Sequence, residues 1–179
     1  MTMKRRDLLK GSAGMTASMT ALGFATKAEA QPAHPLSIKV KMPLRGVVRE
    51  RAIVPDLAFG LSLANGWRRY FVVEIDRGTM PVVRSNSTQT SFEQKMRTYL
   101  AAYASKQHER CFGWKSFRVL TVTSDDNRMQ SMMDALRNLR VSRGQSPSLF
   151  LFATRAELAS RDPLSNVWSD GNCRHSGLS

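Results

Sequence analysis

The sequence is poor in the residues that build metal fingers and disulfide-rich proteins. Among its 179 residues it has two cysteines, Cys111 and Cys173, and three histidines. The cysteines lack paired metal-binding spacing and the histidines are scattered, which argues against a structural zinc site. A disulfide between the two cysteines is expected only if the protein is exported, because the cytoplasm keeps thiols reduced.

Acidic residues are also scarce, with 14 Asp and Glu against 27 Lys and Arg, for a net charge of +13. Residues 1–30 contribute 5 − 2 = +3, so residues 31–179 carry 13 − 3 = +10. This excess predicts a polyanionic partner, nucleic acid first and an anionic membrane surface second. The alternative is that the charge only keeps the protein soluble. The length and the 42% apolar share fit one domain with a sizeable core, plus tails.

Residues 1–30 resemble a twin-arginine export signal. Arg5 and Arg6 precede a polar residue, two leucines and a lysine, a mildly apolar run covers residues 11–26, and residues 28–30 form a small-x-small cleavage site. The run is too short and too rich in Gly, Ser and Thr to remain in a bilayer. The alternative is a disordered leader in which the arginine pair is accidental.

The stretch from residue 54 to residue 79 predicts two strands joined by a tight turn. Asn65 and Gly66 form a strong hairpin signal, because glycine accepts a positive φ without steric cost. The second strand, expected over residues 69–75, is rich in Tyr, Phe and Val, as half-buried strands are.

Carboxylates gather at one end of this expected hairpin. Glu74 and Asp76 point the same way, since alternate side chains of a strand share a face. Pairing of the strands about the turn brings Asp56 near Glu74. Three converging carboxylates could hold a hard cation such as Mg²⁺. The alternative is a surface hairpin whose acids are solvated or pair with nearby arginines.

Periodicity in the rest of the chain predicts further strands at residues 36–42, 117–123 and 149–153, and helices at about 91–108, 126–139 and 155–160. Lys95 lies beside the apolar face of the first helix, and the Met-rich stripe of the second is expected in the core. The last twenty residues are expected to be weakly ordered, with Trp168 docked on the core. The order β-β-β-α-β-α-β predicts an α/β fold with a mixed β-sheet sandwiched by helices.

Several short sequence motifs along these elements resemble those of the replication-relaxation family of plasmid and mobile-element proteins. The core of that family is PD-(D/E)xK nuclease-like. The motifs are Pro55-Asp56, the Glu-Ile-Asp-Arg-Gly-Thr-Met-Pro run at 74–81, Ser91-Phe92 with Lys95, Phe-Gly-Trp at 112–114, and the strands at 117–123 and 149–152. The resemblance covers an α/β domain over residues 36–171, which follows the export-like or disordered leader (1–30) and precedes a polar tail (172–179).

The resemblance implies a DNA-associated replication-control protein with a nuclease-like fold. The nuclease motif has a lysine two residues after the acid of the second strand, and this chain has Asp76 there, which favours a protein without catalysis. Members of the family commonly carry a winged helix-turn-helix region before the core. Here the export-like segment stands in its place.

Two other functions stay open. In a Mg²⁺-dependent DNA phosphodiesterase or nickase, Asp56 and Glu74 would bind the metal, Asp76 would assist, and Lys95 would replace the missing lysine at the phosphate. In an exported protein of unrelated role, the basic face would meet an anionic surface. The family implies a cytoplasmic protein and the signal a periplasmic one. The residues expected to contact nucleic acid are Arg68, Arg69, Arg77 and Lys115.

Overall fold

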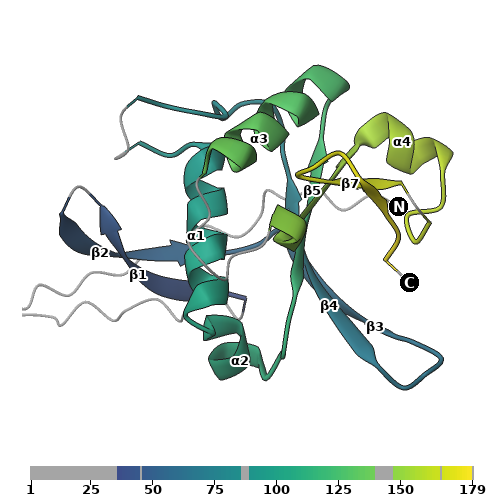
Figure 1. Cartoon of the computed structure of the whole chain (residues 1–179), viewed down its shortest axis with the longest axis horizontal. Coiled ribbons are helices and arrows are strands. Elements are labelled where there is room, and N and C mark those ends of the chain that lie inside the picture. The colour runs from purple at the N-terminus through teal and green to yellow at the C-terminus, as the bar shows by residue number, and fades with distance from the viewer. Residues whose placement is uncertain (1–35, 45, 86–88, 140–146, 166, 179) are drawn as a thin grey trace, which may run out of the picture. The chain divides into compact units, whose positions relative to one another are not determined.

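The computed structural model describes residues 36–178 except 45, 86–88, 140–146 and 166 (Figure 1). The predicted signal, with Arg5 and Arg6, lies outside the described residues. Within the described ranges no helix is both long enough and apolar enough to cross a membrane. Cys111 and Cys173 are exposed free thiols.

The elements follow the chain in this order: β1 (Ile38–Leu44), β2 (Val47–Ile53), β3 (Leu57–Ser62), β4 (Arg68–Ile75), α1 (Phe92–Ala104), α2 (Gln107–Phe112), β5 (Arg118–Thr123), α3 (Asp126–Asn138), the 3-10 turn η1 (Pro147–Leu149), β6 (Phe150–Thr154), α4 (Arg155–Ser160), β7 (Trp168–Asp170) and β8 (His175–Ser176).

The main sheet has the order β3-β4-β5-β6-β7-β8. Its central strands β4, β5 and β6 are parallel, and the outer strands pair antiparallel. The predicted α/β fold with a mixed sheet is therefore confirmed. The connections from β4 to β5 and from β5 to β6 each contain helices, as parallel neighbours require.

The predicted hairpin is present as β3 and β4, with Phe59 paired to Phe71. Gly66 has a φ of +80° in the turn, which explains why glycine is needed there. The Asn65 side chain accepts a hydrogen bond from the Trp67 amide at 3.1 Å and tightens the same turn.

Helices α1 and α3 pack on one face of the main sheet. Met96 and Tyr99 of α1 and Met132 of α3 join Phe150 and Phe152 of β6 in one buried cluster. The methionine stripe is therefore core, as predicted. A second cluster covers the opposite face and combines strand residues with the C-terminal segment: Phe71, Leu120, Leu151, Ala153, Val167, Trp168 and Leu178.

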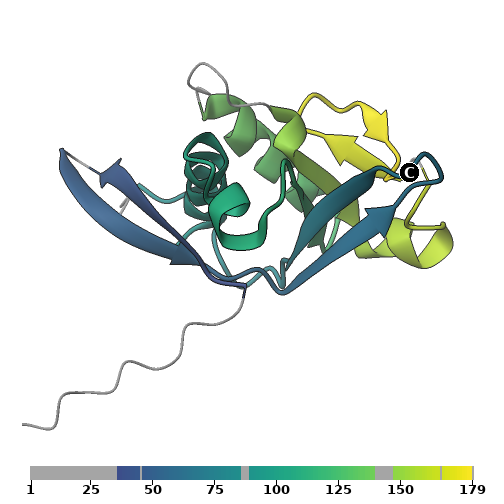
Figure 2. The same cartoon turned by 90° about the horizontal axis from the view of Figure 1, so that it is seen from below.

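Strands β1 and β2 form a separate two-stranded sheet beside α1, on the side away from β4 and β5 (Figure 1, Figure 2). Ile38, Val40 and Ile53 anchor it in the α1 cluster. At its far end Val47 and Val48 are exposed. Strand β1 matches the strand predicted over residues 36–42, whereas β2 was not predicted, because the charged residues 49–51 mask its strand pattern.

Two other regions differ from the sequence expectation. The helix predicted to reach about residue 108 ends at Ala104, where the Ser105 hydroxyl and amide both bind the Ala101 carbonyl. Lys106 then takes a φ of +55° before the separate helix α2. At the C-terminus, residues expected to be weakly ordered or a polar tail form β7 and β8 and bury Leu178. Trp168 docks on the core as predicted.

Candidate functional site

The hairpin brings Asp56 to the end of β4, as the sequence predicts. The Asp56 amide donates to the Val73 carbonyl at 3.0 Å, and the Asp56 Oδ2 atom accepts from the Ile75 amide at 2.8 Å. Asp56 is exposed. Its carboxylate is thus fixed by backbone contacts one residue away from Glu74.

Glu74 is buried against α1, with 1% of its surface exposed. Its Oε2 atom pairs with Lys95 Nζ at 2.5 Å, and its Oε1 atom accepts from the Tyr99 hydroxyl at 2.6 Å. Lys95 and Tyr99 lie one turn apart on α1 and so share one helix face. Both oxygens of Glu74 are therefore engaged by this helix.

The Tyr99 hydroxyl is a permanent donor in this contact. Burial raises the pKa of Tyr99 well above its usual value, and the neighbouring Glu74 carboxylate raises it further. The phenol stays protonated at physiological pH and holds Glu74 in one orientation.

Asp76 lies on the same face of the chain as Glu74 but has different partners. Arg128, in the first turn of α3, pairs with both carboxylate oxygens, and the Thr123 hydroxyl donates to Oδ2 at 3.1 Å. Arg128 Nη2 also donates to the Met80 carbonyl at 2.5 Å, which links α3 to the loop after β4. The backbone carbonyl of Asp76 accepts from Arg155 at 3.2 Å.

The topology of the sheet explains why Arg128 lies beside Asp76. Asp76 follows β4, and α3 follows β5, which is the parallel neighbour of β4. The carboxyl ends of parallel strands meet at one edge of a sheet, where sites of α/β proteins commonly form. A cavity of about 110 Å³ lies at this edge, lined by Glu74, Ile75, Asp76, Arg77, Thr79, Met80, Phe92 and Lys95.

The oxygens of Glu74 and Asp76 are already engaged by side chains of the protein. Lys95 and Tyr99 occupy the oxygens of Glu74, and Arg128 occupies those of Asp76. Across the described residues, no group of three or more His, Cys, Asp or Glu side chains is placed to hold a metal. The arrangement serves as an anchor that joins α1 and α3 to β4.

The four cations expected to contact nucleic acid do not form one surface. Arg68 and Lys115 line a common cavity of about 430 Å³. Arg69 points elsewhere and donates to the Leu178 carbonyl at 3.3 Å. Arg77 lines the small cavity beside Asp76.

Sequence reasoning missed the partners of the acids. It predicted no role for Tyr99 of α1 or for Arg128 of α3. The i, i+4 spacing of Lys95 and Tyr99 was the available signal for the first, since it directs both side chains to one neighbour. For Arg128 there was no local signal, because its approach to Asp76 depends on the parallel pairing of β4 and β5.

No known protein-family model, no curated protein and no solved structure matches this chain.

We expect the ionisation of Asp76 to make the free energy of unfolding depend on pH in the acid range. Burial alone would raise the pKa of Asp76, but hydrogen bonds from Arg128, the Gly78 amide and Thr123 and the charge of Arg128 together lower it below its usual value. A lowered carboxyl pKa stabilises the fold at pH values above the unfolded pKa of about 4, and this stabilisation is lost as pH falls through the folded pKa.

Urea denaturation of the protein and of Asp76→Asn, from pH 7 to pH 2.5, measures the effect. The difference in unfolding free energy between the two should be constant down to about pH 4 and shrink below it. A difference that stays constant to pH 2.5 would show that the Asp76 pKa is not lowered by folding.

Proposed function

We propose that this chain is a DNA-binding replication-control protein whose nuclease-like core does not cleave DNA. The observation that carries the non-catalytic part is the state of the carboxylates. Glu74 and Asp76 are buried and each is neutralised by a protein cation, Lys95 and Arg128 respectively. Such pairs act as structural contacts, whereas a metal-dependent nuclease needs carboxylate oxygens directed at a metal.

Charge supports the DNA-binding part. Residues 31–179 carry +10, and Arg49, Arg51, Arg68 and Lys115 form no ion pair with a described carboxylate. A protein that neutralises several phosphates releases counterions, so its affinity for DNA falls steeply with salt. The proposed role in replication control rests on the sequence motifs that resemble those of the replication-relaxation family.

The β1–β2 hairpin is the surface best suited to a duplex. It carries Lys39, Lys41, Arg49 and Arg51, with Glu50 as the one acid of the two strands as described. Lys39 lies 3.9 Å from Glu50 and is partly neutralised by it. A two-stranded ribbon fits the major groove of B-DNA. Lys39 and Lys41 lie on one face of this ribbon and Arg49 and Arg51 on the other, so its cations would reach phosphates on both sides of the groove.

A Mg²⁺-dependent phosphodiesterase is the second candidate, and one observation favours it. Asp56, Glu74 and Lys95 lie together at the end of β4, which is the set of residue types that the nuclease motif requires. This function would need Glu74 to exchange its contacts with Lys95 and Tyr99 for a metal.

Fluorescence anisotropy with a labelled 20-base-pair duplex, at several salt concentrations, tests the proposed function. We expect log Kobs to fall linearly with log salt, with little dependence on sequence. The Lys41→Ala/Arg49→Ala variant should reduce the magnitude of the slope by about 1 for each phosphate contact removed.

The control is Lys106→Ala, since Lys106 already pairs with Glu109 at 3.6 Å on α2. Its slope should equal that of the unmodified protein. Absence of duplex binding at low salt would rule out the proposed function, and an unchanged slope in the hairpin variant would exclude the hairpin as the contact surface.

A further inference from the structure

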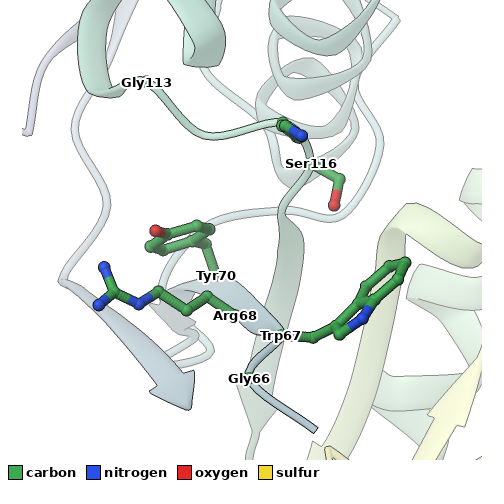
Figure 3. Close-up of a pocket in the computed structure, with 7 residues that line it drawn as sticks. Gly66, Trp67, Arg68, Tyr70, Gly113 and Ser116 are labelled. Carbon is green, nitrogen blue, oxygen red and sulfur yellow. The ribbon is translucent and has the colours of Figure 1, made fainter. Parts of the chain in front are cut away.

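A second basic surface lies at the other hairpin, between the β3–β4 turn and the loop that leads into β5. It is the cavity of about 430 Å³ lined by Gly66, Trp67, Arg68, Tyr70, Gly113, Lys115 and Ser116. Figure 3 shows Arg68 and Tyr70 projecting to one side of β4 and Trp67 to the other, with Ser116 across from them. Its volume lies within the range of about 300–1,000 Å³ found for small-ligand sites.

Backbone contacts hold both walls of this cavity in place. On the hairpin side, the Leu63 amide donates to the Trp67 carbonyl at 2.8 Å, and the Gly66 amide donates to the Leu63 carbonyl at 2.9 Å. On the other side, Gly113 ends α2 with a φ of +69° and donates to the Glu109 carbonyl at 2.9 Å. The lining side chains therefore project from fixed positions.

The aromatic side chains of the cavity differ in their surroundings. Tyr70 is stacked on Trp114, with ring centroids 4.9 Å apart and planes at 8°, so one of its faces is covered. Trp67 is 73% exposed, which is the largest value among the exposed large hydrophobic residues. A bulky indole that is left in water at the rim of a cavity offers a free face for stacking.

The charge of the cavity has one sign. No lining residue is acidic, and no described carboxylate forms an ion pair with Arg68 or Lys115. Two cations without a described carboxylate partner, and an exposed indole that points to the opposite side of β4 from Arg68, suit a ligand that passes over the end of the hairpin and combines phosphate with a flat ring. In a duplex the base faces are stacked on each other, so an exposed indole reaches them only in a single strand.

We propose that this cavity binds single-stranded nucleic acid, with a base stacked on Trp67 and the adjacent phosphates held by Arg68 and Lys115. The proposal rests on the proposed DNA-binding function and specifies a form of DNA that exists where replication opens the duplex. It assigns single strands to the β3–β4 hairpin and leaves the duplex to the β1–β2 hairpin.

The test is the affinity of the full chain for labelled dT15 and for a 15-base-pair duplex, in the same buffer, for three proteins. These are the unmodified protein, Trp67→Ala and Trp67→Phe. We expect Trp67→Ala to raise the Kd for dT15 about 5-fold or more, because base–aromatic stacking contributes about 1–3 kcal/mol. Trp67→Phe should recover most of the affinity, and neither variant should change the Kd for the duplex more than 2-fold.

The outcomes separate this proposal from the one on which it rests. Equal loss of affinity for dT15 and duplex, or no loss for dT15, would overturn the single-strand site while leaving DNA binding intact. Absence of binding to both DNAs by the unmodified protein would overturn both proposals. TMP added as a competitor distinguishes a mononucleotide site, since displacement of dT15 at equal nucleotide concentration would show that the strand itself is not required.

Discussion

Replacement of Arg128 by alanine is expected to lower the free energy of unfolding by about 3–5 kcal/mol. The cost arises because Asp76, only 7% exposed, would keep a buried negative charge without its bidentate partner. The Met80 carbonyl would lose a donor at the same time. Urea denaturation at pH 7 measures the change.

Two variants check the origin of this loss. Arg137→Ala removes an arginine from the same helix whose partner, Asp134, is exposed; we expect a change within about 0.5 kcal/mol, as for other surface pairs. Asp76→Asn/Arg128→Ala should be more stable than Arg128→Ala alone, since the buried charge is gone. If Arg128→Ala matches Arg137→Ala, the Asp76 pair contributes little to folding.

Replacement of Lys95 by methionine is expected to cost a similar amount, about 3–5 kcal/mol, because Glu74 would stay buried with only the Tyr99 hydroxyl as a partner. A lysine that acted at a scissile phosphate would instead leave stability almost unchanged when replaced. Thermal and urea denaturation therefore separate a structural Lys95 from a catalytic one.

A second substitution, at Glu74, tests whether the loss of stability in Lys95→Met comes from the unpaired Glu74 charge. Glu74→Gln/Lys95→Met should regain much of the lost stability, since the neutral amide keeps an acceptor for Tyr99 without an unpaired charge. Lys106→Met, in which the replaced side chain is 68% exposed, is the matched control and should change stability by less than about 0.5 kcal/mol. No recovery in the double variant would show that the loss does not come from Glu74.

Local sequence signals predicted much of the fold. Asn65-Gly66 fixed the β3–β4 turn, and its register placed Asp56 beside Glu74. The methionine spacing of α3 correctly predicted its buried face. These features depend on residues close in sequence, where turn chemistry and periodicity act directly.

The remaining features depend on contacts between distant segments. The pair of Asp76 and Arg128 exists because β4 and β5 are parallel neighbours, which no local pattern specifies. Strand β2 carries alternating charges on an exposed ribbon and lacks the apolar alternation of a typical strand. Strands β7 and β8 are short and owe their place to the burial of Trp168 and Leu178 on the sheet.

We propose that the carboxylate cluster stabilises a fold that binds DNA without cleaving it. Supercoiled plasmid mixed with the full chain and Mg²⁺ or Mn²⁺, with one half of each sample run as a gel shift and the other deproteinised, tests it most directly. The comparison variant is Glu74→Gln, since it removes the charge with the smallest change in packing. We predict a retarded plasmid that stays supercoiled after deproteinisation, with both proteins. Metal-dependent nicking by the unmodified protein that disappears in a folded Glu74→Gln variant would contradict the claim and establish a phosphodiesterase.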